Sequence, residues 1–103
     1  MFQAPEMLSN NYHDFKADIW SLGCIIFNIC HFDFPFSDSN QQRLTNKIIS
    51  GKSRDIDSRF HKNFIKLYQL CMRVNPDDRP SAGQLLGLSF IQNWDKEQNN
   101  NNP

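Results

Sequence analysis

The side chains that could carry chemistry in this sequence are three cysteines and three histidines. The cysteines form no CxxC pair, and no combination of Cys and His has the spacing of zinc ligands. We therefore expect reduced, buried thiols and no metal site. The histidines fall in predicted loops or at a helix start, which favours a solvated role. These residues are Cys24, Cys30, Cys71, His13, His31 and His61.

The motifs of common enzyme classes are not found in this sequence. The four glycines stand alone, so none builds a phosphate-binding loop. Neither HExxH nor a Ser/His/Asp or Cys/His grouping is suggested by the spacing. Asp77 and Asp78 are adjacent carboxylates, but their flanking prolines are typical of a turn or a helix cap. We predict no catalytic, cofactor-binding or metal-binding residue in this chain.

The charge balance restricts the classes of partner. Lys plus Arg equals Asp plus Glu at 11 each, and the pI is about 6.8, so nothing favours a nucleic acid. The longest apolar stretch, Ile19–Phe32, is interrupted by polar residues and is too short to span a bilayer. The chain opens without a secretory signal. We expect no membrane partner and an intracellular location, cytoplasmic or nuclear.

The strongest structural signal is the segment Ala17–Phe32. Its apolar residues cover every side of a helical wheel, which predicts a helix buried on all sides. A buried strand is the alternative, but a length of about sixteen residues favours a helix. The rest of so short a chain can hardly cover this helix completely, so we expect one of its faces to remain exposed.

Four shorter helices are expected around this central one. No segment shows strand-like alternation, so the predicted fold is all-α. Gly51 should end one of these helices, and the pair Ser81 and Gln84 resembles a capping box that opens the last. The Asn-rich tail, residues 94–103, should be disordered. The expected helices are Pro5–Ser9, Gln41–Ser50, Ser58–Val74 and a short one after Ser81.

Four sequence blocks resemble one family, the eukaryotic-type Ser/Thr protein kinases. Ala4-Pro5-Glu6 is an APE triplet, and Lys16–Ile25 is similar to the D-[IV]-W-S-L-G helix at the centre of the large lobe. Phe34-Pro35-Phe36 resembles the following P-F element. Asn75–Ala82 is similar to the [DN]-P-x-x-R-P-[ST]-A segment near the end of the domain. The resemblance implies that residues 1–93 are the C-terminal part of a kinase domain.

Lys47–Gly51 is similar to the corresponding segment of NIMA-related kinases, a subgroup of this family. The resemblance to kinases also limits what the chain can do alone. In the family, the residues that hold ATP and Mg²⁺ precede the APE triplet, so both ligands are implied for a longer parent enzyme with a protein substrate. This chain would need that N-terminal kinase portion as a partner and should be inactive alone. A stand-alone interaction module and a pseudokinase fragment remain alternatives.

Structural roles follow for residues that match the family motifs. Glu6 and Arg79 correspond to an ion pair that ties the APE segment to the loop before the last helix. Asp18 corresponds to an aspartate that accepts hydrogen bonds from the catalytic loop, whose residues are not found here. Trp20 and Gly23 belong to the central-helix motif.

Two further groups of residues take their roles from the same resemblance. Ile25 and Ile29 correspond to anchors of a hydrophobic column. Phe2 and Gln3 match positions that face the substrate. Asn28 lies where basophilic relatives carry a glutamate for a substrate arginine, so that selectivity should be absent.

Overall fold

The computed structural model describes residues 3–10 and 14–88. Phe2, His13 and the predicted tail at residues 94–103 lie outside the described residues. In the described part the chain forms helices and no strand, as predicted. In chain order the helices are α1 (Pro5–Asn10), α2 (Phe15–His31), α3 (Gln41–Ser50), α4 (Lys62–Cys71), the 3₁₀ turn η1 (Pro76–Asp78) and α5 (Ala82–Leu86).

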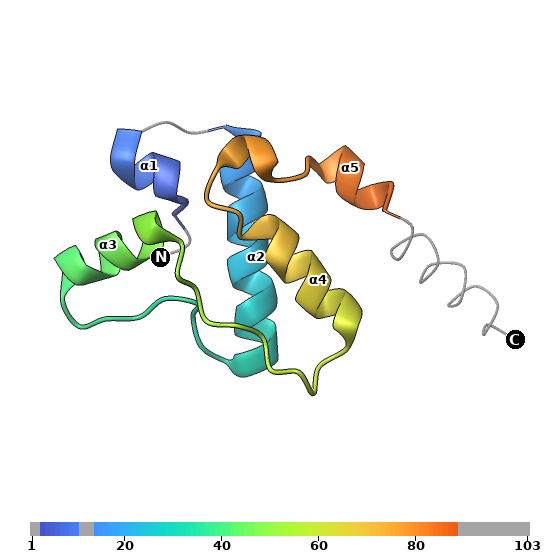
Figure 1. Cartoon of the computed structure of the whole chain (residues 1–103), viewed down its shortest axis with the longest axis horizontal. Coiled ribbons are helices and arrows are strands. Elements are labelled where there is room, and N and C mark those ends of the chain that lie inside the picture. The colour runs from blue at the N-terminus through green and yellow to red at the C-terminus, as the bar shows by residue number, and fades with distance from the viewer. Residues whose placement is uncertain (1–2, 11–13, 89–103) are drawn as a thin grey trace, which may run out of the picture.

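Helix α2 is the central element, with α4 packed along it and the α1–α3 pair on the opposite side in the view of Figure 1. It begins earlier than predicted because the Asp14 carboxylate caps it by accepting the Lys16 N–H at 2.8 Å. It ends at His31, where Phe32 adopts a left-handed conformation (φ 54°) and donates its N–H to the Asn28 carbonyl. The long central helix is therefore confirmed.

The main core lies between α2, α3 and α4. Trp20 and Phe27 of α2 are buried together with Ile48 of α3 and with Tyr68 and Met72 at α4. Gly23 permits the close approach of α2 to α4, because a Cβ placed there would lie 2.7 Å from the Met72 Sδ and 2.9 Å from the Cys71 Cβ. The close packing of α2 against α4 therefore requires a glycine at position 23.

Helix α3 has the predicted bounds because a capping residue stands at each of its ends. The Asn40 side chain accepts the Arg43 N–H at 2.9 Å. Gly51 ends the helix with φ 73°, a conformation that favours glycine. Helix α3 lies beside α1, and the two form a unit away from α4 (Figure 1).

Helix α4 is shorter than the predicted Ser58–Val74. Side chains before Lys62 hydrogen-bond the backbone in non-helical turns: the Asp57 carboxylate accepts the Arg59 N–H, and the His61 imidazole accepts the Asn63 N–H. Such local bonds compete with the helix and move its start toward the C-terminus. At the other end, Met72 caps α4 by donating its N–H to the Tyr68 carbonyl.

The last described helix, α5, opens with the predicted capping box. The Ser81 hydroxyl accepts the Gln84 N–H at 3.1 Å, and the Gln84 side chain accepts the Ser81 N–H at 2.8 Å. Before it, Asn75 caps η1, so Asp77 and Asp78 lie in the turn without capping it themselves. Among the described residues, no helix combines the length and the apolar character needed to cross a membrane.

Candidate functional site

The structure brings Glu6 and Arg79 together as a buried ion pair. The two η nitrogens of Arg79 donate to the two carboxylate oxygens of Glu6, each at 2.8 Å. Arg79 is 1% exposed and Glu6 is 8% exposed. Because each charge is held in a poorly solvated place, each depends on the other for compensation. The pair fastens α1 to the segment between η1 and α5.

The remaining donors of Arg79 are used by backbone carbonyls from two other segments. Its Nη1 donates to the Lys16 carbonyl at 2.8 Å, and its Nη2 donates to the Val74 carbonyl at 3.0 Å. The Nε donates to the Arg73 carbonyl at 2.6 Å. A guanidinium has five N–H donors, so Arg79 has a partner for each of them. We call this arrangement the Arg79 clamp.

Lys16 completes the Arg79 clamp, and sequence reasoning missed it. Its ammonium donates to the carbonyl of Arg79 and to that of Pro76, while its own carbonyl accepts from the Arg79 side chain. The first turn of α2 and the η1 segment therefore exchange side-chain hydrogen bonds. The sequence signal that could have identified Lys16 is its position at the start of the central-helix motif.

Trp20 links the Arg79 clamp to the core. Its ring stacks on Phe36 with the centroids 5.8 Å apart and an angle of 11° between the planes. The Arg79 guanidinium carbon lies 5.0 Å from the centroid of the same ring, within the range of a cation–π contact. Together with Gly23, Trp20 is thus a packing residue between α2 and its neighbours.

One face of α2 is exposed, and it carries a row of apolar side chains that we call the outer stripe. Asp18 lies on this face as an exposed residue of the first turn. Ile25 and Ile29, expected to be anchors in a hydrophobic column, are both exposed here because no described element covers this face. The outer stripe consists of Phe15, Leu22, Ile25 and Ile29, and Phe32 is exposed just beyond the end of the helix.

His31 is not simply solvated, so the prediction is wrong for this residue. Its Nε2 accepts the Asp57 N–H at 3.2 Å. Its ring lies against Phe27, with a centroid separation of 4.6 Å, and edge-on to Phe60 at 5.3 Å. The sequence did not reveal this role because Asp57 and Phe60 are distant from His31 along the chain.

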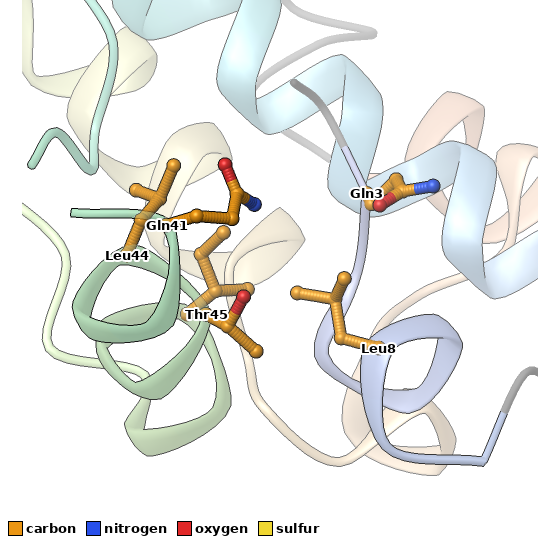
Figure 2. Close-up of a pocket in the computed structure, with 6 residues that line it drawn as sticks. Gln3, Leu8, Gln41, Leu44 and Thr45 are labelled. Atoms are coloured by element: carbon orange, nitrogen blue, oxygen red, sulfur yellow. The ribbon is translucent and has the colours of Figure 1, made fainter. Parts of the chain in front are cut away.

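Gln3 and Asn28, two predicted substrate-facing residues, lie in different parts of the fold. Gln3 is at a pocket of about 100 Å³ between α1 and α3 (Figure 2). Asn28 lies near the end of α2, where its side-chain amide donates to the Asp33 carbonyl at 3.1 Å. Apart from Gln3, the pocket is lined by Leu8, Gln41, Leu44, Thr45 and Ile48.

The three cysteines are free thiols. Burial raises the pKa of Cys24 to about 12 and that of Cys71 to about 11. Burial also raises the pKa of Cys30, which is partly exposed. Since the thiolate is the nucleophile, none of the three is activated for covalent chemistry at neutral pH.

Comparison with known proteins identifies the family in which this buried clamp occurs. The family model described as "Protein kinase domain" matches residues 1–91. The chain is 34% identical over 97 residues to the probable serine/threonine-protein kinase nek2 of Dictyostelium discoideum, a match covering 94% of this chain and 23% of that protein. It is 35% identical over 91 residues to Nek5 of Mus musculus, covering 88% of this chain and 14% of Nek5.

A solved structure shares the same fold. It is described as "Crystal structure of Rad53 kinase domain and SCD2 in complex with AMPPNP" and matches with a TM-score of 0.75 and 26% identity, over 88% of this chain and 38% of that one. The chain thus spans less than a quarter of the length of the two kinases above. The expected similarity to NIMA-related kinases and the expected kinase-type helical fold are confirmed. This chain belongs to the protein kinase family, and residues 1–91 are part of its kinase domain.

Proposed function

We propose that this chain is the helical C-terminal subdomain of a Ser/Thr protein kinase and that it supports the substrate-facing segment of the parent enzyme. The observation that carries the proposal is the buried, bidentate pair of Glu6 and Arg79 in a chain of this family. The pair holds α1 against the η1–α5 segment. It therefore fixes the backbone that leads through Gln3 into α1, where the family faces its protein substrate.

The chemistry of the parent enzyme would be transfer of the γ-phosphate of ATP to a protein hydroxyl, with Mg²⁺. Nek2 and Nek5, by their names, are serine/threonine kinases, and the Rad53 kinase domain was solved with AMPPNP. Phosphoryl transfer depends on a lysine, aspartates and Mg²⁺ placed around the phosphates. The α1–α3 pocket does not fit that task, because none of its lining residues carries a charge. We therefore propose that the 103 residues alone do not transfer phosphate.

A chimera tests the supporting role directly. Residues 1–91 of this chain would replace the matching segment of Dictyostelium nek2, and phosphorylation of a generic Ser/Thr substrate protein would be measured. We expect the chimera to phosphorylate the substrate, because a 34% identical segment should restore the same clamp. The isolated chain should show no saturable ATP binding by calorimetry and no phosphoryl transfer.

Two variants of the chimera test whether the inserted segment supports kinase activity or is only structurally tolerated. In the chimera, Arg79→Ala should lower kinase activity at least tenfold, because the partner carboxylate loses its compensation. Arg59→Ala, at a side chain that is 88% exposed, is the matched control and should leave activity unchanged. A folded but inactive chimera would contradict the proposal. Discrete ATP-independent binding of a partner by the isolated chain, with an inactive chimera, would instead favour the interaction module.

A further inference from the structure

Lys16 in the first turn of α2 and Arg79 after η1 bind each other through their backbone carbonyls. The Lys16 ammonium donates to the Arg79 carbonyl, and the Arg79 Nη1 donates to the Lys16 carbonyl at 2.8 Å. The two residues are 63 positions apart in the chain. Because the two hydrogen bonds run in opposite directions between the same residues, they fix the orientation of the two segments as well as their separation.

The Lys16 ammonium also binds the C-terminal end of η1. Its second acceptor is the Pro76 carbonyl at 3.5 Å, which accepts the Arg79 N–H at 3.2 Å as well. Carbonyls at a helix C-terminus lack donors within the helix, and lysine side chains are among the groups that supply them. Lys16 therefore holds the backbone from which the Arg79 side chain extends, and η1 lies beside the start of α2 (Figure 1).

A second residue on the same face of α2 contacts the other end of Arg79. Trp20 lies four positions after Lys16, a spacing that places two side chains on one helix face. The Arg79 guanidinium carbon is 5.0 Å from the centroid of the Trp20 ring. Lys16 thus holds the backbone of Arg79, and Trp20 packs against its guanidinium. Held at both ends, Arg79 reaches the Glu6 carboxylate with both of its η nitrogens.

From this arrangement we propose that Lys16 is a positioning residue for the protein substrate of the parent kinase. Lys16 orients Arg79 toward Glu6, and Glu6 belongs to α1, which continues the segment that contains Gln3. The last step, from α1 to the substrate, rests on the proposed function. The new element is that the ion pair depends on Lys16, a residue outside the pair.

A double-mutant cycle in the full chain tests whether the ion pair depends on Lys16. Lys16→Met keeps the aliphatic stem and removes the donors, and Glu6→Gln removes the carboxylate charge. Chemical denaturation measures by what factor each single variant and the double variant lower the folding equilibrium constant. We expect the factor for the double variant to be at least about threefold smaller than the product of the single factors, because residues of one network are not additive.

The matched control for this cycle is Lys62→Met combined with Glu6→Gln. Lys62 is exposed at the start of α4, so the factors of these two variants should simply multiply. If the factors for Lys16→Met and Glu6→Gln also simply multiply, the dependence of the ion pair on Lys16 is overturned.

The nek2 chimera tests the effect on the substrate. Lys16→Met should raise the KM for the protein substrate at least about fivefold and change the KM for ATP by less than about twofold, because it removes a charged hydrogen bond that acts on substrate binding. Lys16→Arg keeps the donors and should recover most of the change. Lys62→Met should leave both KM values unchanged. A role in folding alone would reduce the amount of active enzyme without raising the KM for one substrate.

The two measurements bear on separate statements. An inactive chimera would contradict the proposed function, and the cycle in the full chain would still decide whether the ion pair depends on Lys16. In an active chimera, an unchanged KM for the protein substrate, an equal rise in both KM values, or no recovery with Lys16→Arg would overturn the positioning role. The chimera also decides this role if Lys16→Met does not fold in the isolated chain.

Discussion

The two faces of α2 differ sharply although they belong to one helix. On the inner face, Trp20, Ile26 and Phe27 are buried, and the Arg79 clamp joins the first turn of the helix to three other segments. On the outer face, Ile25 and Ile29 contribute exposed apolar surface. The difference shows that the described elements pack around one face of α2 and leave apolar residues of the other face exposed.

The largest expected effect comes from breaking the Arg79 clamp. Arg79→Ala should lower the free energy of unfolding by about 3–5 kcal/mol, because it strands the buried Glu6 carboxylate. Chemical denaturation followed by far-UV circular dichroism measures this loss. Arg59→Ala removes an exposed guanidinium paired with Asp57, and it should leave the stability almost unchanged. Equal losses at the two arginines would remove the contrast between the buried clamp and the surface.

A pair of isoleucines on α2 compares its two faces directly. Ile26 is 8% exposed and Ile29 is 70% exposed. Ile26→Ala should destabilise the fold by about 2–5 kcal/mol through lost burial and a cavity. Ile29→Ala should change the stability of the monomer by less than about 0.5 kcal/mol. Urea titrations measure both, and a similar loss at both sites would mean that the outer face is covered.

The close approach of α2 to α4 is probed at Gly23. Gly23→Ala places a Cβ too near the Met72 Sδ and the Cys71 Cβ, so it should cost about 1–3 kcal/mol by overpacking. Gly83→Ala in α5 meets only the Ser81 Oγ at 3.9 Å and should instead be neutral or stabilising by about 0.5–1 kcal/mol. In thermal melts, Gly23→Ala should lower the melting temperature and Gly83→Ala should leave it unchanged or raise it. A downward shift for both would assign the effect to glycine replacement in general.

The smallest expected effect lies at Asp38, just before α3, and depends on pH. The Asn40 N–H first, and then the Lys47 ammonium, lower the pKa of Asp38 from its ordinary 3.8 to about 2. Because the folded pKa lies below the unfolded one, the stabilisation is complete above pH of about 4 and is lost as pH falls toward 2. Asp38→Asn should therefore be less stable than the parent chain at pH 6, and the difference should shrink on acidification. Denaturation at a series of pH values would show this, and a constant difference would contradict it.

Several features of this protein were determined by residues that are neighbours in the sequence. The bounds of α3 follow from Asn40 and Gly51, and the start of α5 follows from Ser81 and Gln84. Capping and helix termination involve atoms within one or two turns, so a local pattern is enough to predict them. The pairing of Glu6 with Arg79, which are 73 positions apart, was predicted from the family resemblance and not from a local pattern.

Tertiary structure alone decided which groups complete the site and which face of α2 is exposed. The bonds from Lys16 to the Pro76 and Arg79 carbonyls join residues far apart in the chain, and so does the contact of His31 with the Asp57 N–H. An apolar wheel shows that α2 can be buried on every side, but exposure depends on which elements reach each face. In the described part of the chain, the apolar residues of α3 and α4 pack against the inner face of α2 and leave its outer face exposed.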